Sequence, residues 1–233
     1  MIKTVLFDLD GTLSTMEEKD FSSNYLKLLA PKFNPFIEPE QVIKQIITST
    51  EVMKNNLDVN VTNMQAFMND FNQSLGLAEF ITWPIFMEFY QYTFPELKDL
   101  AKPEPGGREA VEAALEKGLD ISIASNAVLP RIAMQERLRW AAIDHLPVSY
   151  LPSIEEMHFC KPQIEFFQEL LEKTGRKPED CLMVGDDPME DMIAGKLGIK
   201  TFLIERGDPQ ASLPFKPDYR GTLEDVKELI ISL

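Results

Sequence analysis

Acidic and polar side chains directly follow three short apolar segments of the sequence. These side chains are Asp8 and Asp10, then Ser125 and Asn126, and finally Asp186 and Asp187. If the three apolar segments are strands of one parallel sheet, each set lies on a strand-to-helix turn at the carboxyl edge of that sheet, where ligands bind. We therefore expect residues far apart in the sequence to converge on a single site.

Three carboxylates of this group indicate what the site could bind. Asp8 and Asp10 are two residues apart just past a strand, so their side chains point the same way. With Asp186 beside them, the three negative charges would repel one another unless a cation lay among them. Mg²⁺ is a hard dication that takes oxygen ligands, and it is the cofactor that we predict here.

Gly11 adds a second indication about the ligand. This residue follows Asp10, and it permits a tight turn in which backbone N–H groups come close to an anion. A site with dense negative charge around a metal ion suits phosphoryl transfer, where positioning and charge neutralisation do most of the catalytic work. The residue types therefore favour a phosphorylated ligand.

Several of these residues also have a purely structural interpretation. Ser125 and Asn126 could cap the N-terminus of a helix. Asp187 could be favoured at the start of a helix by the helix dipole, and Lys161 could be an ordinary surface lysine. Their grouping at the ends of expected strands favours the functional interpretation.

The elements that must position these residues can be predicted from apolar patterns. Residues 2–7 contain an apolar run without polar alternation, which predicts a strand buried on both faces. Later in the chain, helical and strand patterns alternate, and this predicts an α/β fold with a doubly wound parallel sheet, a Rossmann-like core. The further strands are expected at 119–124, 181–184 and 200–204, and the helices at 106–117, 126–140, 163–174 and 190–197, with a capping box at Thr222 and Asp225.

Between the first strand and this alternating part, the sequence has a helical character. Apolar residues recur at helical spacing over roughly residues 14–94, prolines separate the segments, and no convincing buried strand is present. We predict an inserted α-helical cap domain at 14–95, with residues 1–13 and 96–233 forming the core. The polar cap residues that could determine specificity are Lys44, Lys54, Tyr90 and Tyr92.

Composition excludes several classes of partner. The net charge of −15 repels a phosphate backbone, so we expect no polymeric nucleic acid as a partner. No apolar run approaches the roughly 18 residues needed to span a bilayer. Asp8 and Asp10 interrupt the apolar N-terminal stretch, which is untypical of a signal peptide. We therefore expect a cytoplasmic location, with Cys160 and Cys181 as reduced packing residues.

Four ordered motifs resemble those of the haloacid dehalogenase superfamily. Residues 7–13 (FDLDGTL) are similar to its first motif, DxDGT. Ser125 after its strand is similar to the second motif, Lys161-Pro162 to the third, and residues 185–191 (GDDPMED) to the fourth. A helical insert between the first two motifs resembles the subgroup with phosphoglycolate phosphatases, nucleotidases, phosphonate hydrolases and sugar-phosphate mutases.

The resemblance implies a role for each catalytic residue. Asp8 would attack phosphorus and form an aspartyl-phosphate. Asp10 would protonate the leaving oxygen and then deprotonate the hydrolytic water. Ser125 would donate a hydrogen bond to a phosphoryl oxygen, and Lys161 would neutralise charge on the phosphoryl group and Asp8.

The same resemblance implies a metal site and supporting residues. Mg²⁺ would be bound by Asp8, the backbone carbonyl of Asp10, and Asp186. Asp191 would support this set, either as a ligand or by orienting Lys161, with Asp187 as a further supporting residue. Substrate contacts would come from the loop and the second motif, at Gly11, Thr12 and Asn126.

Asp10 favours one reaction over the others in the superfamily. Dehalogenating members lack a carboxylate at this position, because a halide leaving group needs no proton. We therefore predict a Mg²⁺-dependent phosphatase that hydrolyses a small phosphate monoester. The alternatives are a sugar phosphomutase, which returns the phosphoryl group to a sugar, and a non-catalytic metabolite-binding relative.

Overall fold

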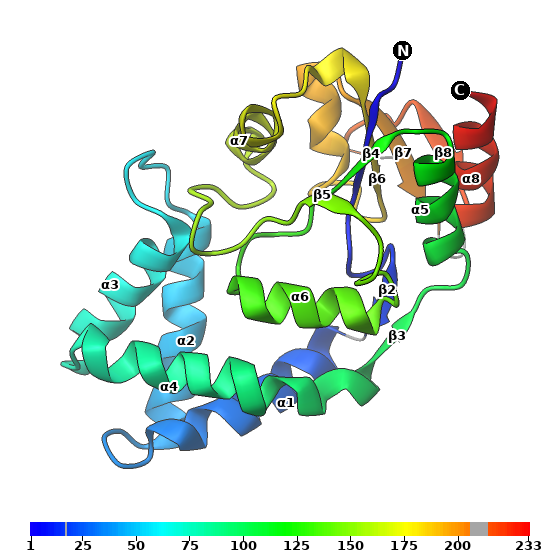
Figure 1. Cartoon of the computed structure of the whole chain (residues 1–233). Helices are drawn as coiled ribbons and strands as arrows, with labels where there is room; N and C mark the ends of the chain where they lie inside the picture. The colour runs from blue at the N-terminus through cyan, green and yellow to red at the C-terminus, as the bar shows by residue number, and fades with distance from the viewer. Residues whose placement is uncertain (17, 206–213) are drawn as a thin grey trace.

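The computed structural model describes residues 1–16, 18–205 and 214–233. Figure 1 shows a sheet flanked by helices, with a separate group of helices beside it. The sheet has six parallel strands in the order β5-β4-β1-β6-β7-β8, which confirms the predicted fold class. The strands are β1 (Thr4–Phe7), β4 (Asp120–Ile123), β5 (Val148–Tyr150), β6 (Cys181–Gly185), β7 (Lys200–Ile204) and β8 (Tyr219–Gly221).

The first strand lies at the centre of the sheet. Phe7, the last residue of β1, is level with Ile123 of β4 on one side and Val184 of β6 on the other. The residues that follow these three strands therefore leave the sheet at neighbouring positions along one edge. This register is the structural basis for the convergence expected from the sequence.

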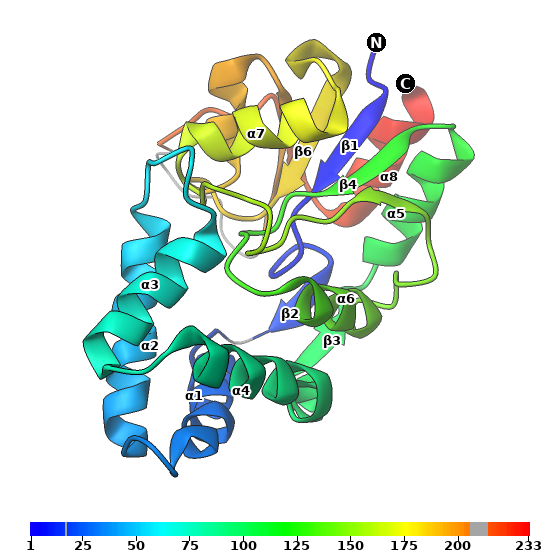
Figure 2. The same cartoon turned by 60° about the vertical axis from the view of Figure 1, so that its left-hand side comes forward.

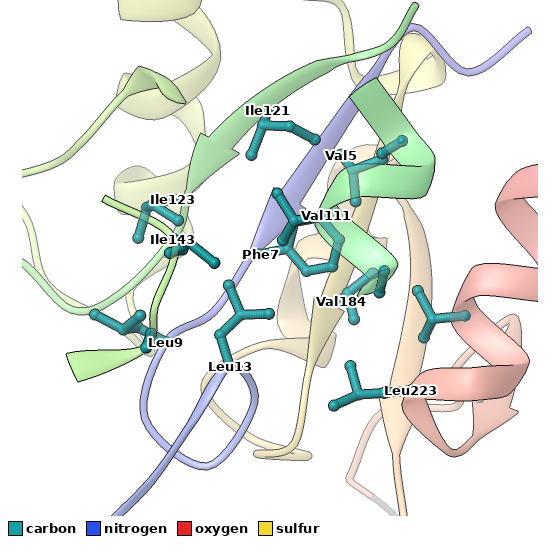
Figure 3. Packing of buried hydrophobic residues seen from close by; sticks show 14 of the residues in the cluster. Val5, Phe7, Leu9, Leu13, Val111, Ile121, Ile123, Ile143, Val184 and Leu223 are labelled. Atoms are coloured by element: carbon teal, nitrogen blue, oxygen red, sulfur yellow. The ribbon is translucent and has the colours of Figure 1, made fainter. Parts of the chain in front are cut away.

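Helices cover both faces of the sheet, which explains the unbroken apolar run in β1. Val5 and Phe7 point to one face, where they pack with Val111 and Leu223 (Figure 3). Leu6 points to the other face and packs in a second cluster. The helices of this part are α5 (Gly107–Glu116), α6 (Arg131–Trp140), α7 (Ile164–Thr174), α8 (Leu223–Ser232) and the 3-10 helices η3 (Pro178–Asp180) and η4 (Met192–Leu197).

The inserted segment folds around an aromatic cluster of its own. Phe33, Phe71 and Phe86 meet edge to face, with ring centroids 5.2 to 5.6 Å apart. Figure 2 shows the helices of the inserted segment grouped apart from the sheet. They are α1 (Glu18–Leu29), η1 (Ala30–Phe33), α2 (Pro39–Lys54), α3 (Asn63–Leu75), α4 (Glu79–Tyr92) and η2 (Phe94–Leu100).

A short antiparallel ribbon joins the helical insert to the sheet. It pairs β2 (Ser14–Met16) with β3 (Ala101–Pro103), and neither strand was predicted. Each strand has three residues and one partner, too few to show a periodic pattern. Pro95, the end of the predicted insert, lies in the first turn of η2, a position that proline tolerates in a helix. The division into core and cap domains stays a prediction.

Other local differences have similar causes. The edge strands β5 and β8 are three residues long and only partly buried, so the sequence pattern missed them. The helix expected over 190–197 is the shorter 3-10 helix η4.

The predicted capping box is confirmed, because Asp225 N donates to Thr222 Oγ1 at 3.3 Å and Thr222 N donates to Asp225 Oδ2 at 2.7 Å. Among the described residues, no helix has both the length and the apolar character needed to cross a membrane.

Candidate active site

A cavity of about 730 Å³ lies between the carboxyl edge of the sheet and the helical insert. This volume is within the range of small-molecule sites. Nine of the predicted site residues line the cavity, and they come from loops that are distant in the sequence. They are Asp8, Asp10, Gly11, Ser125, Asn126, Lys161, Asp186, Asp187 and Asp191.

Lys161 connects two carboxylates at the base of the cavity. Its Nζ donates to Asp8 Oδ1 at 2.8 Å and to Asp191 Oδ1 at 2.5 Å, and the lysine side chain is only 2% exposed. Burial alone would lower the pKa of this ammonium group, but Asp191 and Asp8 outweigh that effect and raise its pKa above the usual value. Lys161 is therefore charged, and it holds the carboxylate of Asp8 in a fixed orientation.

Asp191 is the most deeply buried carboxylate of the site. Burial raises the pKa of its carboxyl group above the usual value, and Lys161 opposes that shift. A 2.5 Å contact between the two groups is a charge-assisted hydrogen bond. Of the two roles expected for Asp191, the contact with Lys161 is present in the structure.

Three carboxylates form a group that could hold a metal ion. One oxygen from each of Asp8, Asp186 and Asp191 lies within 4.8 Å of the other two. The donor atoms are all carboxylate oxygens, the ligand type that Mg²⁺ takes. These residues therefore fit the predicted metal, while the side chain of Asp10 lies outside this group of three.

The loop after β1 packs tightly against Asp186. Gly11 has a φ of +82°, a left-handed conformation that side chains disfavour, and a Cβ at this position would collide with the Asp186 carboxylate. Thr12 is fully buried, and its Oγ1 donates to Asp186 Oδ1 at 3.2 Å. Gly11 and Thr12 thus position the first motif against the fourth.

The second motif holds the backbone of Lys161. Asn126 Oδ1 accepts from Lys161 N at 3.2 Å, and Asn126 Nδ2 donates to the carbonyl oxygen of Lys161 at 3.4 Å. Ser125 is buried, at 3% exposure, and lines the same cavity as Asp8. Asn126 therefore has a positioning role in the structure, and its predicted contact with substrate stays a prediction.

Asp187 behaves mainly as a turn residue. Its side chain accepts hydrogen bonds from the backbone N–H groups of Met189 at 2.7 Å and Glu190 at 2.8 Å. These bonds support the turn at 188–191 and not the helix start that the sequence interpretation gave for Asp187, because the next helix, η4, begins at Met192. Glu190 also lines the cavity, and burial raises the pKa of its carboxyl group.

Arg137 is a site residue that the sequence interpretation missed. It lies on α6, its side chain is 5% exposed, and its Nη2 forms an ion pair with Asp10 Oδ2. Burial lowers the pKa of this guanidinium to about 10, an effect that the charge of Asp8 opposes. Arg137 is still protonated at neutral pH and so is a permanent cation next to Asp10.

The insert contributes the opposite wall of the cavity. Of the four polar cap residues named from the sequence, Lys54 and Tyr90 line it, whereas Lys44 and Tyr92 are exposed elsewhere. The hydroxyl groups of Tyr90 and Tyr25 are 2.7 Å apart, and burial raises the pKa of Tyr25 to about 12. Both phenols are therefore neutral hydrogen-bonding groups on a largely apolar wall.

The chain resembles known proteins over most of its length. A family model described as haloacid dehalogenase-like hydrolase matches residues 2–198. The pyrophosphatase PpaX of Bacillus cereus (strain AH820) is 26% identical over 206 residues, which are 86% of this chain and 82% of that protein.

Solved structures show the same fold. A HAD phosphatase from Thermococcus onnurineus has a TM-score of 0.60 at 19% identity, over 98% of both chains. A predicted phosphoglycolate phosphatase from Haemophilus somnus 129pt has a TM-score of 0.58 at 20% identity, over 98% of this chain and 97% of that one.

Proposed function

The chain belongs to the haloacid dehalogenase-like hydrolases, and we propose that it is a Mg²⁺-dependent phosphatase acting on a small phosphate monoester. One observation carries the proposal: Lys161 fixes Asp8 at the base of a cavity that Asp10 also lines. A nucleophile and an acid/base group thus face the same space. The similarity to a pyrophosphatase supports a phosphorylated substrate.

The residues suggest a reaction in two steps. In the first, an Asp8 oxygen forms a bond to phosphorus, the bond from phosphorus to the ester oxygen breaks, and Asp10 gives that oxygen a proton. In the second, a water oxygen forms a bond to phosphorus while Asp10 takes a proton from that water. The bond from phosphorus to the Asp8 oxygen breaks, which releases inorganic phosphate and regenerates the Asp8 carboxylate. Lys161 neutralises negative charge next to Asp8 in both steps.

The metal would be held at the same edge of the sheet. We assign Asp8, Asp186 and the backbone carbonyl of Asp10 as its ligands, with Asp191 close enough to join them. Mg²⁺ bound there would neutralise charge on the phosphoryl group during transfer. Ser125 would donate a hydrogen bond to a phosphoryl oxygen.

The residues that line the cavity favour a small substrate with a second anionic group. Among the described residues that line it, Lys54 is the one cation from the insert, whereas Lys161 and Arg137 are engaged with carboxylates. Pyrophosphate and phosphoglycolate, the compounds in the names of the relatives, both carry a second anionic group. We therefore propose a small phosphorylated metabolite as substrate, used in the cytoplasm, and not a nucleic acid polymer.

A sugar phosphomutase is the second candidate. Such an enzyme needs an acid/base group in the cap, and Glu51 of α2 is the carboxylate that the described part of the insert contributes to the cavity lining. Isomerisation of a sugar phosphate without net phosphate release would favour this candidate over the phosphatase.

The test is phosphate release from an aryl phosphate and a panel of small monoesters, with Mg²⁺ or with a chelator. Asp8→Asn nearly preserves the shape of the nucleophile and removes its reactivity. Asp144→Asn, at an exposed position, is the matched control. Mg²⁺-dependent release that is lost only in Asp8→Asn supports the proposal, and turnover that survives in Asp8→Asn contradicts it.

A further inference from the structure

Arg137 is a buried arginine whose guanidinium contacts the carboxylate of Asp10. The residue is 4% exposed, whereas the Asp10 side chain is 40% exposed and lines the cavity. The ion pair therefore joins a group inside the protein to the group that the proposed reaction uses for proton transfer.

The helix that carries Arg137 is fixed from two directions. Met134 and Leu138 of α6 pack in the apolar cluster of the sheet. Trp140, at the end of the same helix, packs in the cluster of the insert and stacks on Phe94, with ring centroids 5.0 Å apart. Arg137 thus projects from a helix held at the junction between sheet and insert, as Figure 2 shows for α6.

The contacts of the guanidinium make Asp10 its main partner. Nη2 pairs with Asp10 Oδ2, and Nη1 lies 3.4 Å from Met134 Sδ, which is a weak acceptor. The buried Nε has no hydrogen-bond partner within the described part of the chain. An arginine held this way keeps one oxygen of Asp10 occupied and leaves Oδ1 for other partners.

We propose that Arg137 is a positioning residue, which holds Asp10 so that Oδ1 exchanges the proton with the leaving oxygen and with water. The inference rests on the proposed phosphatase function. As the ester bond from phosphorus to oxygen breaks, the proton moves from Asp10 Oδ1 to the departing oxygen. Oδ2 accepts from the guanidinium both before and after this transfer, so the orientation is kept through the cycle.

A merely structural role would have different consequences. An ion pair that only stabilised the junction would affect folding, and it would lower the activity on all substrates alike. A residue that acts through the general acid affects substrates according to their need for protonation. The dependence on the leaving group therefore separates the two roles.

The test compares kcat/KM for two substrates, since kcat/KM reports the steps up to formation of the aspartyl-phosphate. 2,4-Dinitrophenyl phosphate has a leaving group that departs without a proton, whereas an alkyl phosphate, the one that the wild type hydrolyses fastest, needs one. General acid catalysis contributes about 10²- to 10⁴-fold. We expect Arg137→Met to lower kcat/KM about 100-fold for the alkyl phosphate and less than about tenfold for the dinitrophenyl ester.

Four further variants make the test specific. Asp10→Asn with Arg137→Met is expected to lose no more activity than Asp10→Asn alone, because both changes remove one function. Arg137→Lys keeps the charge, is expected to restore part of the alkyl phosphate activity, and carries the test if Arg137→Met does not fold. Arg139→Met, two residues away on the exposed face, is the control expected to leave both values unchanged.

Equal losses on the two substrates, or additive losses in the double variant, would overturn the role of Arg137. If the wild type releases phosphate from neither substrate, the proposed function itself is wrong, and the inference fails with it. Wild-type activity on both substrates therefore separates the two kinds of failure.

Discussion

Removal of the charge of Lys161 is expected to destabilise the folded protein by about 4 kcal/mol. Its ammonium group makes two charge-assisted hydrogen bonds, at 2.8 Å to Asp8 and 2.5 Å to Asp191, and is almost completely buried. A hydrogen bond to a charged group contributes about 1.5 to 3 kcal/mol, so the two together contribute about 3 to 6 kcal/mol. Breaking a buried ion pair from one side costs about 3 to 5 kcal/mol, because a buried charge is left uncompensated.

The assay is urea denaturation of Lys161→Met and wild type, both in a chelator so that no metal compensates for the lost charge. Lys3→Met is the matched control, since Lys3 is also 2.8 Å from a carboxylate, Asp180, but its side chain is 60% exposed. An exposed pair of this kind contributes about 1 kcal/mol or less. We expect the free energy of unfolding to fall several times more in Lys161→Met than in the control.

A second substitution tests the cause of the destabilisation. Adding Asp191→Asn to Lys161→Met removes one of the two carboxylates left without the ammonium. The double variant is expected to be more stable than Lys161→Met by about 1 to 3 kcal/mol. A Lys161→Met protein as stable as the Lys3 control, or a double variant less stable than the single one, would show that the buried ion pairs of Lys161 do not stabilise the fold as expected.

Three other predictions follow from the same geometry. Gly11→Ala places a Cβ against the Asp186 carboxylate and strains a left-handed φ, so we expect kcat/KM to fall at least about tenfold. Gly76→Ala is the control, because it has the same backbone strain, about 1 to 2 kcal/mol, without a collision. The control should lower only the melting temperature. Burial raises the pKa of the Cys160 thiol to about 12, so its thiolate fraction at pH 8 is small. A disulfide reagent should therefore label Cys160 far more slowly in the folded protein than in urea. Equal labelling rates in the two conditions would contradict this prediction. Lys54→Met should raise the KM for pyrophosphate about tenfold and the KM for an aryl phosphate only a little. Lys44→Met, on the exposed side of the same helix, is the control and should change neither KM. A similar rise of KM for both substrates would exclude a contact between Lys54 and a second anionic group of the substrate.

Much of the fold was predictable because local patterns determine it. The buried strand β1 has an apolar run, and the alternation of strands and helices that follows it permits few topologies. The loops that carry the candidate site residues were predictable because these residues adjoin strands. Asp8 directly follows β1 and Asp186 directly follows β6, whereas one residue separates Ser125 from the end of β4. A parallel sheet then brings these ends together without any further information from the sequence.

Arg137 was missed because its partner depends on tertiary packing. Arg137 comes three residues after Met134 and one residue before Leu138, and both of these residues are buried. It therefore falls close to the buried face of α6. A charged residue at such a position was the available signal. Its contact with Asp10 depends on how α6 sits between the sheet and the insert, and local patterns do not determine this.

The cap wall illustrates the same limit. Lys44 and Lys54 are both polar positions on α2, and the helical pattern treats them alike. Lys54 lines the cavity, and Gln163 donates to its carbonyl oxygen at 2.7 Å, which ties the end of α2 to the sheet side. A hydrogen bond between residues so distant in the sequence cannot be read from periodicity.

The proposed mechanism requires that Asp8 becomes phosphorylated during turnover. The most direct measurement is mass spectrometry of the wild-type enzyme, quenched in acid during turnover of an aryl phosphate and digested. We expect a phosphate on the peptide that contains Asp8, removable by hydroxylamine and absent from Asp8→Asn. Phosphate release by the wild type with no phosphorylated peptide, or with the phosphate on another residue, would contradict it.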